Sequence, residues 1–425
     1  MNNRSSLRSW FTVIIASLFF FYEFIQMNMF NSISGSLMHD FNINATQLSQ
    51  MSSYYFIANV IFLFFAGILL DRYSAKKIIL AALAVCVAGI VGFASAQSYW
   101  TAVLFRFFTG IGSAFCFLSV IRLATRWFHD HQLALVTSVI VAMAMAGGIL
   151  AQTPLEILTQ HLVWRHALLA DAGLGIVIFV IIALLVRDYP AGQKHSAEIG
   201  FAEVNAIGYW RSFGLAFLKL QNWLGGIYTS LMNLPISILG GLWGVMYLQD
   251  AHGISHIDAG NITIMLFLGT IIGGPIFGWI SDKIGLRRWP MLIGAVVSFI
   301  LMAFVIMLPG LSYFALLMLF LLIGFSTSSQ IIGYPVVAES SMPAIVAMSV
   351  SVVNITTQGG QAIFQRLYGR LMDLHAQYSH SAAGLYNGHD FQWAMLIFPV
   401  GFIIAFFAAF ALKETYAKPN EEHLS

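Results

Sequence analysis

Charged side chains are scarce in this sequence: Asp, Glu, Lys and Arg make up only 9% of its 425 residues. Soluble domains carry about 25% charged residues, and so few charges cannot cover the surface of a soluble protein of this length. The 20 basic and 18 acidic residues give a net charge of +2, which does not favour a nucleic-acid partner. Much of the surface is therefore expected to face lipid.

Cysteine is nearly absent as well. Cys86 and Cys116 both lie in apolar runs and are interpreted as buried small hydrophobic residues, not as a disulfide or metal ligands. The 12 histidines show no metal-ligand spacing, and no HExxH, GxSxG or phosphate-binding loop occurs. We therefore predict no metal, no cofactor and no catalytic site. A transport process would then draw its energy from an ion or solute gradient.

Apolar runs replace the missing charges, since 59% of the residues are hydrophobic. A hydrocarbon core about 30 Å thick needs about 20 apolar residues per helix, and a helix satisfies its own backbone polar groups in lipid. The first run is too long for a signal-peptide core and is interpreted as an uncleaved span. We predict an all-α integral membrane protein with twelve transmembrane helices near residues 10–37, 47–70, 77–97, 99–122, 132–157, 165–187, 222–248, 259–281, 289–309, 311–337, 343–371 and 391–412.

The longest polar stretch divides these spans six and six. It separates a predicted N-terminal six-helix bundle, residues 1–187, from a C-terminal bundle, residues 222–425. The linker, residues 188–221, mixes aromatic and basic side chains near its end. That mixture is typical of a short helix lying in the membrane interface, so the linker is predicted to hold one.

Lys and Arg gather in the loops on one side of the predicted spans. Only Arg165, Arg366 and Arg370 are expected on the other side. Cytoplasmic loops of membrane proteins carry the excess of basic residues. We therefore place both termini and the linker in the cytoplasm and predict a multi-pass protein of the bacterial inner membrane.

Two loops, one after span 2 and one after span 8, repeat the same pattern about half the chain length apart. Each has a glycine, an acidic–basic pair four residues later, and then further basic residues. An internal repeat at half length indicates two homologous halves. The pattern comprises Gly67, Asp71 and Arg72 in the first loop and Gly278, Asp282, Lys283 and Gly285 in the second.

These loops resemble the signature cytoplasmic loop of the major facilitator superfamily, Gly-x-x-x-Asp-Arg-x-Gly-Arg-Arg. The first copy departs from it, with Ser74 at the second glycine and Ala75 at a basic position. The sequence around Arg106 is similar to the family's fourth-helix motif. The resemblance implies two pseudo-symmetric six-helix bundles that alternate access to a central cavity. It also implies that Asp71 faces the start of span 11 and Asp282 the start of span 5, where both act as gates.

Charges inside the spans mark the candidate site, because a mid-bilayer charge usually faces a cavity or a partner. Glu23 lies about 20 Å from the cytoplasmic end of span 1 and Arg106 about 10 Å from the outer end of span 4, so they share a similar depth. The resemblance places both spans beside the cavity, although a purely structural ion pair is an alternative. Asp171 is expected to pair with its neighbours Arg165 and His166, and a role in transport is the alternative. Further candidate substrate contacts are Tyr22, Gln26, Asn233, Gln330, Tyr334, Asn354 and Gln358.

A secondary transporter accounts for these features best. We predict a monomer that imports a small polar solute, an amino acid or similar nutrient, together with protons. The sequence also resembles the nutrient-uptake branch that includes phagosomal transporters of intracellular pathogens. Proton-coupled efflux is the alternative within this class, favoured by Gly147, Gly148 and Pro154 in span 5. A non-transporting membrane receptor is the alternative from another class, because a transporter fold does not prove transport.

The predicted topology can be tested by cysteine labelling. A cysteine introduced at Ser196 should resist an impermeant thiol reagent in intact cells, because the positive-inside rule places the linker in the cytoplasm. A cysteine at Ser381 should be labelled, and permeabilised cells should label both. The reverse pattern in intact cells would contradict the orientation.

Overall fold

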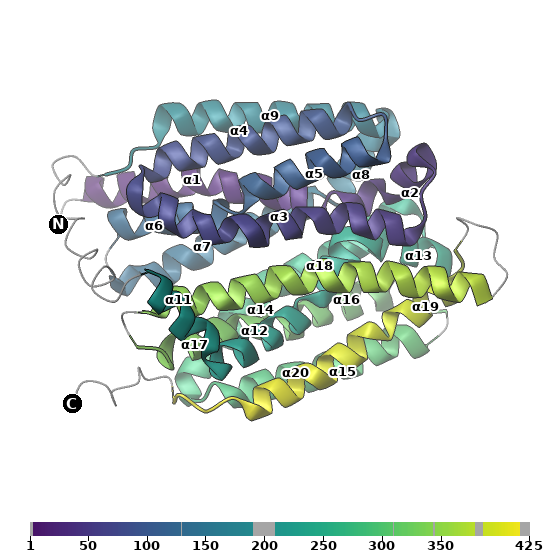
Figure 1. Ribbon diagram of the computed structural model, residues 1–425. Coiled ribbons are helices and arrows are strands. Elements are labelled where there is room, and N and C mark those ends of the chain that lie inside the picture. The colour runs from purple at the N-terminus through teal and green to yellow at the C-terminus, as the bar shows by residue number, and fades with distance from the viewer. Residues whose placement is uncertain are drawn as a thin grey trace.

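The computed structural model describes residues 3–128, 130–189, 209–308, 310–342, 345–378 and 386–416, and these form a bundle of helices (Figure 1). The first half of the chain contains α1 (Asn3–Asn28), α2 (Phe30–Phe41), α3 (Ala45–Arg72), α4 (Ala75–Ala94), α5 (Tyr99–Ser113), α6 (Cys116–Trp127), α7 (Asp130–Leu150), α8 (Thr153–His161) and α9 (Trp164–Leu185). A short helix, α11 (Tyr209–Leu218), precedes the second half. That half contains α12 (Leu220–Met232), η2 (Ile236–Trp243), α13 (Gly244–His252), α14 (His256–Ile284), α15 (Arg288–Met307), α16 (Tyr313–Thr327), η3 (Ser328–Ile332), α17 (Gly333–Glu339), α18 (Val346–Tyr378), α19 (Gly388–Met395) and α20 (Ile397–Ala411).

The predicted all-α membrane fold is confirmed. Among the described residues, ten segments are long and apolar enough to cross a membrane, and the bent pair formed by α12 with η2 and α13 makes an eleventh. The remaining predicted span is α18, whose 33 residues are long enough to cross but include many polar side chains. It packs against α3 and α12. Neighbouring helices therefore shield much of its polar surface from lipid.

The same capping arrangement occurs in both halves. Asp188, which follows α9, accepts a hydrogen bond from the backbone N–H of Lys76 (3.1 Å) at the start of α4. Glu414, which follows α20, accepts from the backbone N–H groups of Arg287 (2.8 Å) and Arg288 (3.0 Å) at the start of α15. A carboxylate is stabilised at a helix N-terminus by the free N–H groups and the helix dipole. This repeat supports two homologous halves, and the domain boundaries themselves stay a prediction.

The seventh span is broken near its middle. Pro235 has no backbone N–H to donate, and beyond it the chain continues as the π-helix η2. The span bends by 42° at the break between α12 and η2. Side chains bond to carbonyls of this segment: Gln152 Nε2 donates to Gly240 O (2.8 Å) and Gln365 Nε2 donates to Ser237 O (2.8 Å). Backbone groups that an irregular helix releases need such partners in the membrane.

The two ends of the bundle differ in how the halves meet. The described start of α1 and end of α20 lie at one end, here called the proximal end, whereas α2, α13 and α19 lie toward the opposite, distal end (Figure 1). Polar contacts between the halves gather at the distal end. There the first N–H groups of α3 reach the second half, with Thr46 donating to Asp373 (3.0 Å) and Ala45 to the Tyr386 hydroxyl (2.8 Å).

A buried glutamine forms a second distal connection. Gln152 Oε1 accepts from Asn31 Nδ2 (2.6 Å) in its own half and from Thr263 Oγ1 (2.9 Å) in the other, while its Nε2 reaches Gly240 O. Gln152 is fully buried. We call these four residues the Gln152 latch. Because a buried amide is costly to leave unpaired, the latch favours the conformation in which the distal ends are together.

Replacing Gln152 by Leu should open the distal end more often. Leucine cannot bond to Asn31, Thr263 or Gly240, and each buried polar group left unpaired costs about 1–3 kcal/mol in the closed form. Spin labels on cysteines introduced at His39 and His389 should show a larger population at long distance. The matched control is Gln221→Leu, because Gln221 bridges only to Lys413 within the second half. An unchanged distance distribution for Gln152→Leu would contradict the role of the latch.

Candidate functional site

Six polar or charged side chains meet inside the first half, and none is more than 7% exposed. They come from four different spans, in α1, α3, α5 and α9; α1 packs against α9, and α3 packs against α5. Three of the predicted site residues on α1 and the predicted arginine of span 4 are among them. We call this group the Arg106 cluster; it consists of Tyr22, Glu23, Gln26, Tyr55, Arg106 and Asp171.

The Arg106 guanidinium is held between two aromatic rings. Its central carbon lies 4.5 Å from the Phe30 ring centre and 4.4 Å from that of Tyr55, a geometry in which a cation is attracted to the ring faces. Nη1 donates to the backbone carbonyl of Gln26 (2.7 Å). Nε and Nη2 are buried without a hydrogen-bond partner. One edge of a fully buried guanidinium is thus free to bond.

Glu23 and Arg106 lie in one cluster but do not form an ion pair. Instead, the Tyr55 hydroxyl donates to Glu23 Oε1, while the ring of the same tyrosine covers Arg106. The second carboxylate oxygen of Glu23, Oε2, has no partner. Glu23 and Arg106, for which the sequence predicts a similar depth, are therefore connected through a third residue. Tyr55 belongs to a polar and aromatic face of span 2.

Asp171 belongs to this cluster, and the expected pairing with Arg165 is wrong. Asp171 Oδ2 accepts from Gln26 Nε2 at 2.6 Å. Arg165 instead pairs with Asp40 at 2.5 Å at the distal end. Positions six apart on a helix do not share a face, which separates Arg165 from Asp171. Donation from the Trp164 indole, followed by the Arg165 contact, holds the pKa of Asp40 below its ordinary value.

The predicted site residues of the second half lie on α12, η3, α17 and α18 and are half-buried. The Tyr334 hydroxyl donates to Asn354 Oδ1 (2.9 Å), and the Gln330 carbonyl accepts from Thr229 (3.2 Å). Gln358 Oε1 is buried without a partner, and Asn233 ends α12. None of the described hydrogen bonds joins these residues to the Arg106 cluster.

Apolar contacts connect the halves near the Arg106 cluster. Phe24, one residue after Glu23, borders two small hydrophobic groups that each contain residues of both halves. The first group consists of Met27, Tyr55, Phe56 and Ala362, and the second consists of Met145, Ile236 and Phe267. Apolar side chains of both halves therefore border the Arg106 cluster, and Tyr55 belongs to the cluster and to one of these groups.

The second signature loop is paired within its own half. Asp282 contacts Arg287 (2.5 Å), and the same guanidinium binds Glu339 at the end of span 10 (2.5 Å). The Asp282 side chain is 67% exposed. The implied contact with the start of span 5 stays a prediction, because several side chains between 129 and 134 lie outside the described residues. A gating role for Asp282 stays a prediction for the conformation in which the proximal ends meet.

The structure describes the side-chain surroundings of the second signature loop but not those of the first. Gly285 ends α14 with φ +68, a left-handed conformation that glycine adopts at low cost. Lys283 Nζ lies 4.6 Å from the Trp279 ring centre, and Gly278 has open space beside its α-carbon. The positions of the first loop lie in α3, but their side chains are outside the described residues; they are Gly67, Asp71 and Arg72.

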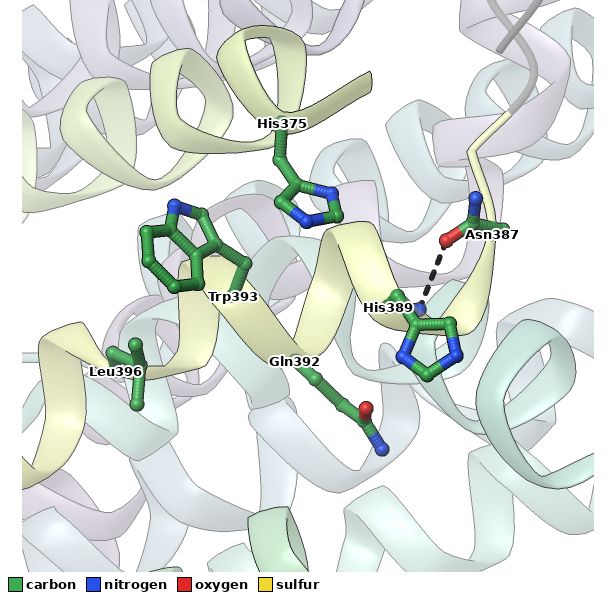
Figure 2. A pocket seen from close by; sticks show the side chains of 6 residues that line it. All are labelled: His375, Asn387, His389, Gln392, Trp393 and Leu396. Atoms are coloured by element: carbon green, nitrogen blue, oxygen red, sulfur yellow. Dashed lines mark hydrogen bonds between the residues drawn. The ribbon is translucent and has the colours of Figure 1, made fainter. Parts of the chain in front are cut away.

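A surface pocket of ≈ 380 Å³ lies between α18 and α19 toward the distal end (Figure 2). His375, Trp393 and His389 are among its lining residues. His375 Nδ1 contacts the buried carboxylate of Asp390 (2.6 Å), and its ring stacks on Trp393. None of the predicted site residues lines this pocket, so it is separate from the Arg106 cluster.

Comparison with known proteins identifies the fold family. The family model described as Major Facilitator Superfamily matches residues 15–364 and 226–424. The chain belongs to the Major Facilitator Superfamily. This membership confirms the family resemblance and a transporter fold in place of a membrane-embedded enzyme. The chain is also 24% identical to the membrane sensor protein UhpC of Escherichia coli (strain K12), over 75% of this chain and 76% of that protein.

Other superfamily members also share low sequence identity with this chain. The probable galactarate/D-glucarate transporter GudP of Escherichia coli (strain K12) is 23% identical over 71% of this chain and 73% of its own length. Among solved structures, a bacterial homologue of the human lysosomal transporter Spinster, inward-facing and unoccupied, matches with a TM-score of 0.73 and 16% identity, covering 97% and 99% of the two chains. The D-xylose-proton symporter gives 0.72 and 14% identity, over 97% and 99%. These matches show a shared fold.

Proposed function

We propose that the protein is a proton-coupled importer of a small polar solute that carries a carboxylate, such as an amino acid or a sugar acid. The observation that carries this proposal is the free edge of Arg106. Nε and Nη2 are the two donors on one side of the guanidinium, and both are buried without a partner. A carboxylate can accept from two such donors at once. A substrate carboxylate would then be the hydrogen-bond acceptor for Nε and Nη2 of Arg106.

The chemistry of similar proteins supports an acidic solute. Among relatives of similar identity are the galactarate/D-glucarate transporter, a hexuronate transporter of Bacillus subtilis (strain 168) and a probable nitrate/nitrite transporter of Mycobacterium tuberculosis. Each of these names refers to an anion. A buried cation with unused donors is the feature that an anion site requires, and Arg106 has it.

Glu23 is the group that we assign to proton coupling. Its carboxylate accepts a hydrogen bond from the hydroxyl of Tyr55, and the ring face of the same tyrosine contacts Arg106. When a substrate carboxylate binds Arg106, Glu23 loses the benefit of the nearby positive charge. Two negative charges are unfavourable in a dry site, so a proton binds to Glu23 with the substrate.

The proximal and distal ends of the bundle would act as the inner and outer gates. With both termini in the cytoplasm, the proximal end faces the cytoplasm and the structure corresponds to an inward-facing form, closed outside by the Gln152 latch and by Asp373. Importing transporters must open the outer end to receive solute. The acids of the two signature loops are expected to hold the proximal end closed in that alternate form.

A second candidate function is that of a membrane sensor. The similarity to UhpC, which covers three quarters of both chains, favours it specifically. A sensor would bind the same kind of solute at Arg106 without moving it across the membrane. Binding alone therefore does not distinguish the two functions, and a flux measurement does.

The proposal is tested by binding first. A thermal-shift screen of amino acids, sugar acids and neutral sugars should find carboxylates that stabilise the purified protein, because a ligand of the folded state raises its melting temperature. Arg106→Lys keeps the charge but loses the fork, and should weaken binding roughly 10- to 100-fold. The matched control is Arg165→Lys at the distal surface, which should bind normally. Stabilisation by neutral sugars alone would contradict an anion site.

The coupling is tested by flux in proteoliposomes loaded with the carboxylate found in that screen. Glu23→Gln should lose uptake driven by a pH gradient and retain exchange of labelled for unlabelled solute, because its site is fixed in the neutral form. Unchanged rate and pH dependence would show that Glu23 is structural. Binding without any exchange by the wild-type protein would favour the sensor.

A further inference from the structure

The Arg106 cluster contains one more acid than base. Glu23 and Asp171 are both carboxylic acids, and Arg106 is the cluster's cation. With both acids ionised the group would carry a net negative charge inside a lipid-embedded bundle. An uncompensated buried charge is strongly unfavourable, and the usual response is that a proton binds.

Asp171 is the acid without a cation. From α1 it faces Tyr22 and Gln26. α4 carries two bases, both at its start: Lys76 bonds the Ala183 carbonyl near the proximal end of α9, and Lys77 is exposed. On α8, which also packs on α9, Glu156 pairs instead with His256 of the second half (2.6 Å).

Arg106 does not compensate Asp171 directly. Its Nη1 is bonded to the backbone carbonyl of Gln26, whose side chain in turn donates to Asp171. Gln26 therefore stands between the guanidinium and this carboxyl group. Glu23, held through Tyr55 against the guanidinium, is the acid that benefits from the positive charge.

The hydrogen bonds of Gln26 fit a neutral acid better than a carboxylate. Gln26 Nε2 donates to Asp171 Oδ2, but Gln26 Oε1 is buried without a partner. An ionised carboxylate has only acceptors and cannot satisfy this oxygen. A protonated acid can accept the amide N–H through one oxygen and donate its O–H to the amide oxygen through the other. Both groups are then satisfied.

We infer that Asp171 is a second proton-binding site, which holds a proton in the substrate-free protein and is linked to Arg106 through Gln26. This inference rests on the proposed function for its role in transport. With Asp171 neutral, ionised Glu23 balances Arg106. A bound carboxylate then replaces Glu23 as the counter-ion, and Glu23 takes up one proton. Each monoanion enters with one proton, while the proton on Asp171 keeps both forms neutral.

Infrared spectroscopy of the substrate-free protein in lipid tests this inference without a substrate. At neutral pH the wild type should show the carbonyl stretch of a buried carboxylic acid. Asp171→Asn should lose that band, and Glu23→Gln should keep it. Loss of the band in Glu23→Gln with retention in Asp171→Asn would overturn the assignment.

Two further measurements remain decisive if Asp171→Asn does not fold. Wild-type protein carrying carboxyl-13C aspartate should show the band shifted, because the acid is then an aspartate. Gln26→Leu should move the band to higher frequency, since the carbonyl loses its amide partner. An unshifted band in either sample would overturn the inference. If the infrared results are as expected but the wild-type protein shows no flux in proteoliposomes, only the proposed transport function is contradicted.

Discussion

The guanidinium of Arg106 is the group on which the interior of the first half depends. A charge buried in a lipid-embedded bundle must be compensated nearby, because neither water nor lipid can do so. The compensation is spread over two ring faces, one backbone carbonyl and, through Tyr55, the carboxylate of Glu23. Each of these partners comes from a different turn or helix. The position of Arg106 thus fixes how α1, α3 and α5 pack.

Backbone polar groups also need buried partners where a span is broken. The π-helix of span 7 offers carbonyls to Gln152 of the first half and to Gln365 of the second. Polar groups that would be unpaired in one half are therefore paired by the other. A change in the distance between the halves breaks the bonds of Gln152 to Gly240 and Thr263 together, so the distal contacts favour two discrete arrangements over intermediate ones.

The Arg106 cluster and the Gln152 latch both include residues of the first span, which is formed by α1 and α2. Gln26 lies on α1 within the Arg106 cluster, and Asn31 lies on α2 within the Gln152 latch, with the break at Met29 between them. A ligand bound at Arg106, as proposed above, would act on the Gln26 carbonyl, which lies about one turn before Asn31 of the latch. This short connection offers a physical route by which an occupied site changes the stability of the closed end.

Some properties were determined by the sequence alone. The scarcity of charge and the apolar runs required a helical membrane protein, and the repeated loops indicated two halves and the superfamily. Gly285 was predicted from its motif and adopts the left-handed conformation that this position requires. Glu23 and Arg106 were found because charges are rare inside spans. These features follow from composition and one-dimensional spacing, which need no knowledge of how helices pack.

Only the tertiary structure decided how these groups are connected. The neighbours of Asp171 in sequence suggested Arg165, but helix rotation directs Arg165 to Asp40 and leaves Asp171 to Gln26. Tyr55 and Gln152 are ordinary polar residues in sequence and acquire their roles from the helices that face them. Hydrogen bonds extend only about 3 Å, so the partner of a buried side chain depends on helix rotation and register, which the hydropathy pattern does not specify.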